Sequence, residues 1–173
     1  MKYKKRLGYV VGVCLAGGLL MTTLAACQST ESKTEAVESP KVLDMKAADK
    51  AATEYMKAYI DMDKKKLNEL HINKYDFLNG DGVKDPGASD KLKDRYELFR
   101  YDLNEGSNEY YYKARFYHPA NGGRSSVELR IMKDKKDGKW KNYGWAWEAS
   151  HSLESIVGNT KPVQVHKWEG ERE

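Results

Sequence analysis

The chain has 173 residues, with 30 lysines and arginines against 26 aspartates and glutamates, which suits one domain with a core of its own. The first 26 residues hold four of the basic residues and no acidic one, so residues 27–173 carry 26 charges of each sign. This balance argues against a nucleic-acid-binding module, which usually has a basic surface. Both cysteines, Cys14 and Cys27, lie in the first 27 residues, so the remainder has no disulfide framework, thiolate metal site or cysteine nucleophile.

The N-terminal stretch has the three parts of an export signal. Basic residues occur within residues 2–6, an apolar run follows from Leu7 to Leu24, and small Ala25 and Ala26 precede Cys27. Positive charge keeps the N-terminus in the cytoplasm, while the glycines and threonines of the run weaken it as a permanent span. The segment Leu24-Ala25-Ala26-Cys27 resembles the cleavage motif of bacterial lipoproteins.

This resemblance implies that Cys27 receives a diacylglyceryl group and that residues 1–26 are removed as a signal peptide. Two acyl chains anchor a protein stably, since each buried methylene contributes about 0.8 kcal/mol. The expected location is the extracytoplasmic face of a bacterial cell membrane, with the membrane as a partner through the lipid anchor. The alternatives are an uncleaved anchor and an ordinary secretory signal in which Cys27 is incidental.

Two regions are expected after the signal. Residues 27–43 are rich in Ser, Thr, Glu and Lys and bury too little apolar surface to fold, so they predict a flexible tether. A tether of this length spans on the order of 20 Å. Residues 44–173 are expected to form a single domain.

Helical spacing of apolar side chains over residues 45–60 predicts the first helix, with Asp44 as its N-cap. The polar residues of this segment, Asp49 among them, are expected on the opposite face. Asp61 or Asp63 is expected to start a second, shorter helix.

From Lys93 onward the apolar pattern changes to a period of two, although residues 92–103 would also fit a helix. Alternation over residues 110–117, 127–132 and 142–147, separated by Gly-, Pro- and Asp-containing turns, predicts an antiparallel meander with one apolar face. The side chains expected on that face of these three strands are Tyr110, Tyr112, Ala114, Phe116, Val127, Leu129, Ile131, Tyr143, Trp145 and Trp147.

The C-terminal region predicts two small elements. Residues 153–157 suggest a short helix that Gly158 stops. Residues 161–168 suggest either an edge strand or a tail laid over the sheet.

Element order over residues 44–148, together with residues 52–67 at the end of the first helix, resembles the nuclear transport factor two-like (cystatin-like) family. Small lipoproteins of this kind are common in Gram-positive bacteria. The resemblance implies an α+β fold in which an N-terminal helix pair packs on a curved antiparallel sheet to form a cone. It implies no single function, since this fold hosts enzymes, binding proteins and scaffolds.

Aromatic residues are concentrated on the predicted strands. Tyr110, Tyr112, Tyr143, Trp145 and Trp147 are candidates for a platform that stacks on a glycan or an apolar ligand at the concave sheet face. The alternative is that they fill the core beneath the first helix, because large aromatic side chains supply much of the buried area that a domain without cysteines needs.

Asn79, Asp81 and Asp85 have the spacing of the middle of a calcium loop. The first and twelfth positions of that loop, normally acidic, are Phe77 and Ala88 here. An ordinary Gly/Asp-rich turn explains the same residues, so no cofactor is expected, with calcium as the alternative. The four histidines are scattered without metal-ligand spacing.

The expected function is non-catalytic binding of a small ligand, a cell-wall component or another envelope protein, without nucleic acid as a partner. The alternative is an envelope enzyme with an acid/base pair in the cone, for which Asp102, Tyr110 and Tyr112 come into consideration. The sequence has no nucleophile elbow, phosphate loop or metalloprotease helix, so no catalytic residue is assigned. A two-lobed solute-binding protein would need a longer chain.

Overall fold

The computed structural model describes residues 38–73, 84–103, 108–144 and 152–170. The helices in this part of the chain are α1 (Pro40–Ile60), α2 (Lys64–Glu69), the 3-10 helix η2 (Ser89–Leu92) and α3 (Leu153–Val157). The strands are β1 (Tyr96–Tyr101), β2 (Glu109–Tyr117), β3 (Arg124–Lys133), β4 (Trp140–Asn142) and β5 (Val163–His166). The predicted α+β class is therefore confirmed.

The five strands form one antiparallel sheet in the order β4-β3-β2-β1-β5. Strands β1 to β4 are consecutive neighbours, so the predicted meander is confirmed. β5 pairs with the free side of β1, and the edge strand is therefore the correct alternative for residues 161–168. The predicted helix at residues 153–157 is also present, and Gly158 follows it in a left-handed conformation with φ of 52°, which glycine adopts at little cost.

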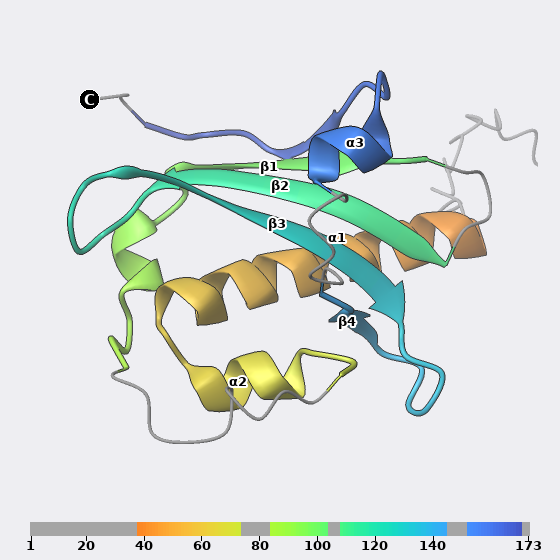
Figure 1. Ribbon diagram of the computed structural model, residues 1–173, viewed down its shortest axis with the longest axis horizontal. Coiled ribbons are helices and arrows are strands. Elements are labelled where there is room, and N and C mark those ends of the chain that lie inside the picture. Colours follow the sequence, from red (N-terminus) through yellow and green to blue (C-terminus); the bar gives the residue numbers. More distant parts are fainter. Residues whose placement is uncertain (1–37, 74–83, 104–107, 145–151, 171–173) are drawn as a thin grey trace, which may run out of the picture. The chain divides into compact units, whose positions relative to one another are not determined.

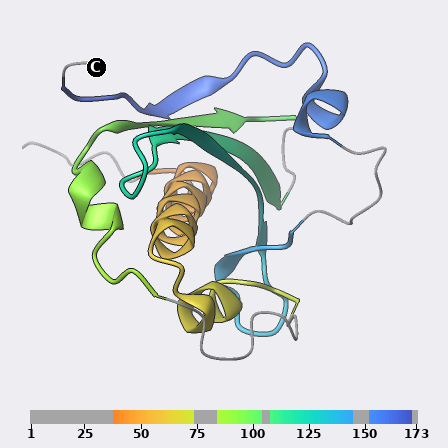
Figure 2. The same ribbon diagram turned by 60° about the vertical axis from the view of Figure 1, so that its left-hand side comes forward.

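Helix α1 packs against one face of the sheet, here called the inner face, and the sheet bends around it (Figures 1 and 2). Small side chains let the helix approach the strands closely, since Ala48 and Ala52 are fully buried. Large apolar side chains of α1 and the strands fill the remaining space. The largest fully buried side chains of this core are Met56, Ile60, Leu98, Tyr112, Leu129 and Ile131.

The first helix begins earlier than predicted. Ser39 is its N-cap, with the hydroxyl accepting from the Val42 amide at 3.4 Å, and Pro40 occupies the first turn. A serine followed by proline is a strong start signal because proline lacks the amide that the first turn leaves unpaired. The prediction of Asp44 as the cap was wrong: its carboxylate instead lies 3.0 Å from the Lys133 ammonium. Residues 40–43, predicted as tether, belong to α1.

The second helix begins after Asp63, one of the two start residues that the sequence predicts. Asp63 is its N-cap and accepts from the Lys66 amide at 3.0 Å. This hydrogen bond lowers the pKa of the Asp63 carboxyl, because it stabilises the charged form. A backbone bridge after α2 pairs His71 with Asn142 and joins this region to β4.

The fourth strand is shorter than predicted and lies earlier. β4 ends at Asn142, and Gly144 has a φ of 78°, which breaks an extended strand. The predicted strand over residues 142–147 was therefore misplaced at its start. Trp145 and Trp147 lie outside the described residues.

Candidate functional site

The described residues cover the outer face of the sheet, opposite α1, only in part. α3 covers one end, where Leu153 and Val157 pack on Tyr111. Beyond α3 the outer side chains of β1, β2 and β3 line a groove of about 490 Å³, here called the basic groove. The residues lining it are Glu97, Lys113, Arg115, Phe116, Tyr117, Arg124, Ser125, Ser126 and Trp168.

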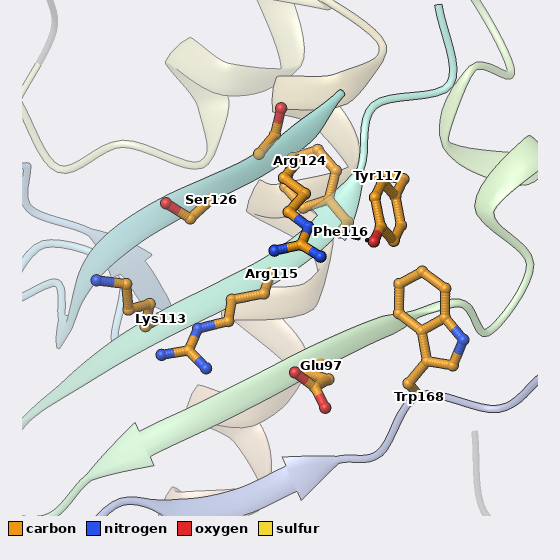
Figure 3. A pocket seen from close by; sticks show the side chains of 9 residues that line it. Glu97, Lys113, Arg115, Phe116, Tyr117, Arg124, Ser126 and Trp168 are labelled. Carbon is orange, nitrogen blue, oxygen red and sulfur yellow. Dashed lines mark hydrogen bonds between the residues drawn. The ribbon is translucent and has the colours of Figure 1, made fainter. Parts of the chain in front are cut away.

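Strand register explains why these side chains meet. Arg115 pairs with Glu97 on β1 and with Ser126 on β3, and Tyr117 pairs with Arg124. Alternate residues of a strand share a face, so these five side chains stand together on the outer face. Figure 3 shows the row, with Lys113 at one end and Tyr117 with Trp168 at the other.

Two aromatic rings form one wall of the groove. The rings of Tyr117 and Trp168 meet edge to face, with centroids 5.6 Å apart and planes at 84°. Trp168 follows β5, so the C-terminal segment supplies half of this wall. The same pair also lines a second groove of about 330 Å³, together with Leu92, Arg95 and His118. The two grooves therefore share the Tyr117–Trp168 wall.

The two exposed arginines of the basic groove are held by neutral groups. The Arg115 guanidinium lies 5.3 Å from the centroid of the Phe99 ring, and the Arg124 Nε donates to the Tyr117 hydroxyl at 3.3 Å. No carboxylate of the described residues lies within ion-pair distance of either guanidinium. Both charges are therefore available to an anion from solvent.

Lys113 is different, because two carboxylates neutralise it. Its ammonium lies 2.8 Å from Glu154 and 3.0 Å from Glu128. The hydrogen bond to Glu154 raises the pKa of the Lys113 ammonium and lowers the pKa of the Glu154 carboxyl. These bonds tie α3 to the sheet, so Lys113 closes the groove at that end.

Of the aromatic residues predicted as a ligand platform, the structure describes Tyr110, Tyr112 and Tyr143, and these three are not brought together on one open surface. Tyr110 and Tyr112 are buried between the sheet and α1, which favours the core alternative for these two. Tyr143 follows β4, and its ring lies 4.9 Å below the Arg130 guanidinium. Trp145 and Trp147 are outside the described residues. The inner sheet face predicted for ligand binding is covered by α1.

Of the three residues predicted to bind calcium, the structure describes only Asp85. Asn79 and Asp81 lie outside the described residues, and the Asp85 amide donates to the Asp61 carbonyl at 3.0 Å. Among the residues that the structure describes, no group of three or more His, Cys, Asp or Glu side chains could hold a metal ion. His71, His118 and His166 lie on separate elements.

A polar network beneath the sheet was missed in the sequence. Arg100, on the inner face of β1, donates to both oxygens of Asp49 at 2.8 and 2.9 Å and to Asp102 at 2.7 Å. The Tyr112 hydroxyl also donates to Asp49, at 2.8 Å. Asp49 is predicted on the solvent face of α1, and this prediction was wrong. Arg100 lies on the same face of β1 as Tyr96 and Leu98, while Phe99 and Tyr101 lie on the outer face.

This network holds two of the three residues considered for acid/base chemistry, Asp102 and Tyr112, and their polar atoms are hydrogen-bonded within it. Burial and the nearby Asp49 charge raise the pKa of the Tyr112 hydroxyl far above its usual range. The carboxylates raise the pKa of the Arg100 guanidinium despite its burial. Tyr112 is therefore a fixed hydrogen-bond donor, and the network is a partly buried ion-pair cluster.

The residues of the basic groove were not selected from the sequence, although one signal was present. Arg115 and Tyr117 occupy the alternate positions of a strand whose other positions are apolar. That alternation predicts that Arg115 and Tyr117 face outward, but it does not show which side chains of the neighbouring strands lie beside them. Arg124 lies on the next strand and Trp168 follows the edge strand β5, so the β2–β3 register and the pairing of β5 with β1 bring them to the same site.

Comparison with known proteins yields no relative: no family model matches the sequence, and neither the curated proteins nor the solved structures contain a match. In the described part of the chain, no helix is both long enough and apolar enough to cross a membrane. The segment Leu24–Cys27, for which lipidation is predicted, lies outside that part.

Proposed function

We propose that this protein is a lipid-anchored, extracytoplasmic binding module that holds a cell-wall component in its basic groove. In this proposal Cys27 carries the lipid, the residues between it and α1 act as a spacer, and the domain binds without catalysis. The membrane is a partner through the anchor. The lipoprotein motif supports the location, and the basic groove supports the binding role.

The observation that carries the binding role is the pair of exposed arginines without carboxylate partners beside two aromatic rings. Elsewhere on the described surface, charged side chains commonly pair, as Lys133 does with Asp44 and Lys141 with Asp134. Guanidinium groups left for solvent in a concave site suit an anionic ligand. A concave site with aromatic walls and a few polar groups is the usual form of a ligand site.

The proposed fold type is the cystatin-like cone, because a single long helix lies in the bend of an antiparallel sheet (Figure 2). In this chain the helix and large apolar side chains fill that bend. The binding surface is therefore proposed on the outer sheet face, rather than on the inner face that the aromatic pattern suggested.

We propose binding rather than the alternative of an envelope enzyme because of the polar network on the inner face. Asp49, Arg100 and Tyr112 satisfy one another through hydrogen bonds of 2.8 to 2.9 Å. A general base needs a free acceptor within reach of substrate, and Tyr112 is fully buried. The network therefore supports a structural role.

Sedimentation with isolated cell walls tests this function. The native protein, extracted in detergent with its own N-terminus, is expected to sediment with the walls. The double variant Arg115→Gln/Arg124→Gln should sediment much less. A matched control, Lys50→Gln/Lys57→Gln, removes two exposed charges from α1 and should sediment like the wild type. Native protein that stays in the supernatant would contradict the proposal.

A further inference from the structure

Building on the proposed function, we infer that the ligand of the basic groove is an anionic carbohydrate chain, in which sugar or polyol units are joined by phosphodiesters. Such a chain presents two kinds of group at regular intervals. One is a phosphodiester, whose two non-bridging oxygens share a negative charge and accept hydrogen bonds. The other is a sugar or polyol unit, which has an apolar carbon face and hydroxyl groups. The groove offers a partner for each kind.

The phosphate partners are Arg115 and Arg124. They lie on the same face of adjacent strands, where Arg115 pairs with Ser126 and Tyr117 pairs with Arg124. The two arginines are therefore diagonal neighbours across the β2–β3 pair. Such diagonal positions are about 7–8 Å apart. A guanidinium matches phosphate oxygens with two parallel hydrogen bonds, and the two arginines can hold one phosphate each or share one.

Both guanidiniums are positioned before a ligand arrives. The Phe99 ring supports Arg115 at 5.3 Å, and the Tyr117 hydroxyl accepts from Arg124 at 3.3 Å. Ordering a long side chain on binding costs conformational entropy. Side chains already held by neutral partners lose less freedom and keep their full charge for the anion.

The carbohydrate partners are the aromatic wall and Ser126. Tyr117 and Trp168 offer apolar ring surface to the carbon face of a sugar, and Ser126, which pairs with Arg115 on the outer face, lines the same groove. This combination distinguishes the site from a simple anion patch. A bare anion would use the arginines and leave the aromatic wall without a function.

The length of the site indicates a chain rather than a single unit. The basic groove of about 490 Å³ and its neighbour of about 330 Å³ share the Tyr117–Trp168 wall. Pockets for small ligands are about 300–1,000 Å³, so each groove suits one or two units. Arg95 in the second groove gives the chain another cation beyond the shared wall.

Glu97 sets a limit on the charge density of the ligand. It lines the basic groove and faces Arg115 across the β1–β2 pair, so its carboxylate repels any anion bound there. Dense polyanions experience this repulsion most. A chain with one phosphate per sugar or polyol is favoured over polyphosphate.

Single-stranded nucleic acid also combines phosphates, sugars and stacking groups. The charge balance of residues 27–173 and the export signal favour a carbohydrate chain at the cell surface instead. Nucleic acid is therefore an outcome to be tested, and a short oligothymidylate serves as its probe.

The test measures binding of four probes to the full-length processed protein in detergent micelles by isothermal titration calorimetry. The probes are glucosylated poly(glycerol phosphate), dextran, inorganic polyphosphate and oligothymidylate. We expect the first to bind tightest. Arg115→Gln/Arg124→Gln should weaken it about tenfold or more, since two charge-assisted hydrogen-bonding groups are lost. Thermal melts check that each variant is folded.

Two further variants separate the parts of the site. Glu97→Gln should strengthen binding of poly(glycerol phosphate) roughly two- to threefold, because one repelling charge is removed at close range. Trp168→Ala should weaken the glucosylated polymer more than the unglucosylated one. Lys50→Gln/Lys57→Gln is the control and should bind like the wild type.

Equal binding by the wild type and the double arginine variant, or tighter binding of oligothymidylate, would overturn the inference. Its failure is separable from failure of the proposed function. Walls stripped of phosphodiester polymers with hydrofluoric acid should no longer sediment the protein. If stripped and intact walls sediment it equally, wall binding stands and the anionic chain is the wrong ligand.

Discussion

Arg100 is the residue on which the polar network under the sheet depends, because it contacts both carboxylates. Its side chain is only 9% exposed, and that of Asp49 is 21% exposed. Removing one partner of a buried pair leaves an uncompensated charge. Arg100→Met is therefore expected to lower the free energy of unfolding by about 3 kcal/mol, measured by urea denaturation.

Two matched variants show whether charge is the cause. Lys50→Met breaks an exposed pair with Glu54, whose atoms lie 3.9 Å apart, and should change stability by less than about 0.5 kcal/mol. Asp49→Asn added to Arg100→Met should restore part of the loss, because the stranded carboxylate is gone. No recovery would mean that lost packing, not charge, destabilises the single variant.

Tyr112 should make the domain sensitive to alkali. Burial raises the pKa of its hydroxyl far above the value of about 10 for an unfolded tyrosine. Above about pH 10 the unfolded chain therefore releases a proton that the folded chain keeps, so stability falls as pH rises. In Tyr112→Phe this contribution, up to about 1.4 kcal/mol per pH unit, should disappear.

The measurement is the free energy of unfolding at a series of pH values from neutral to about pH 11. At neutral pH the variant should lose about 1 kcal/mol, because Asp49 loses one hydrogen bond and keeps Arg100. Parallel curves for the two proteins throughout the alkaline range would refute the assignment of this slope to Tyr112.

At the scale of elements, the start of α1 can be tested by two single substitutions. Ser39→Ala should destabilise the domain by about 0.5–1 kcal/mol, because a cap hydroxyl is lost. Asp44→Ala removes only an exposed pair with Lys133, with side chains 38% and 41% exposed, and should cost less than about 0.5 kcal/mol. The opposite order in thermal or urea melts would restore Asp44 as the cap.

The elements that the sequence predicted well are those with a regular apolar period. Alternation identified β2 and β3, and helical spacing identified α1, because those patterns follow directly from burial of one face. The prediction for Asp49 was wrong because a charged side chain usually indicates an exposed position, and the pattern of residues 92–103 assigned Arg100 to no face. Asp49 lies at helical spacing from Met45 and Ala52, which is the spacing of the buried face. Its carboxylate can be buried there because it pairs with the Arg100 guanidinium.

The basic groove depends on information that no local pattern contains. It combines residues of β1, β2 and β3 with Trp168, and their proximity follows from register and from the edge position of β5. Gly144 gave a local signal that could have ended β4, since a glycine within a strand pattern marks a break. The alternating aromatic residues after it, Trp145 and Trp147, favoured a longer strand instead.

At the scale of the whole molecule, the proposed function depends on where the domain is held. A groove for wall polymer is useful on the outer side of a membrane, and the proposed anchor is one thiol, Cys27. A second cysteine, Cys14, lies within the apolar run Leu7–Leu24 and provides a matched control. Both substitutions, Cys27→Ser and Cys14→Ser, remove one sulfur from the N-terminal region.

Only Cys27→Ser should abolish incorporation of labelled fatty acid and retain the leader. In the proposed processing, lipid transfer needs the thiol at the end of the Leu24–Cys27 motif, and cleavage follows lipid transfer. Cys14→Ser should be labelled and processed like the wild type, because the proposed cleavage before Cys27 removes Cys14. Mass spectrometry of the purified native protein should find an acyl-modified cysteine as the first residue. Any other first residue would show that the domain does not carry the proposed lipid anchor.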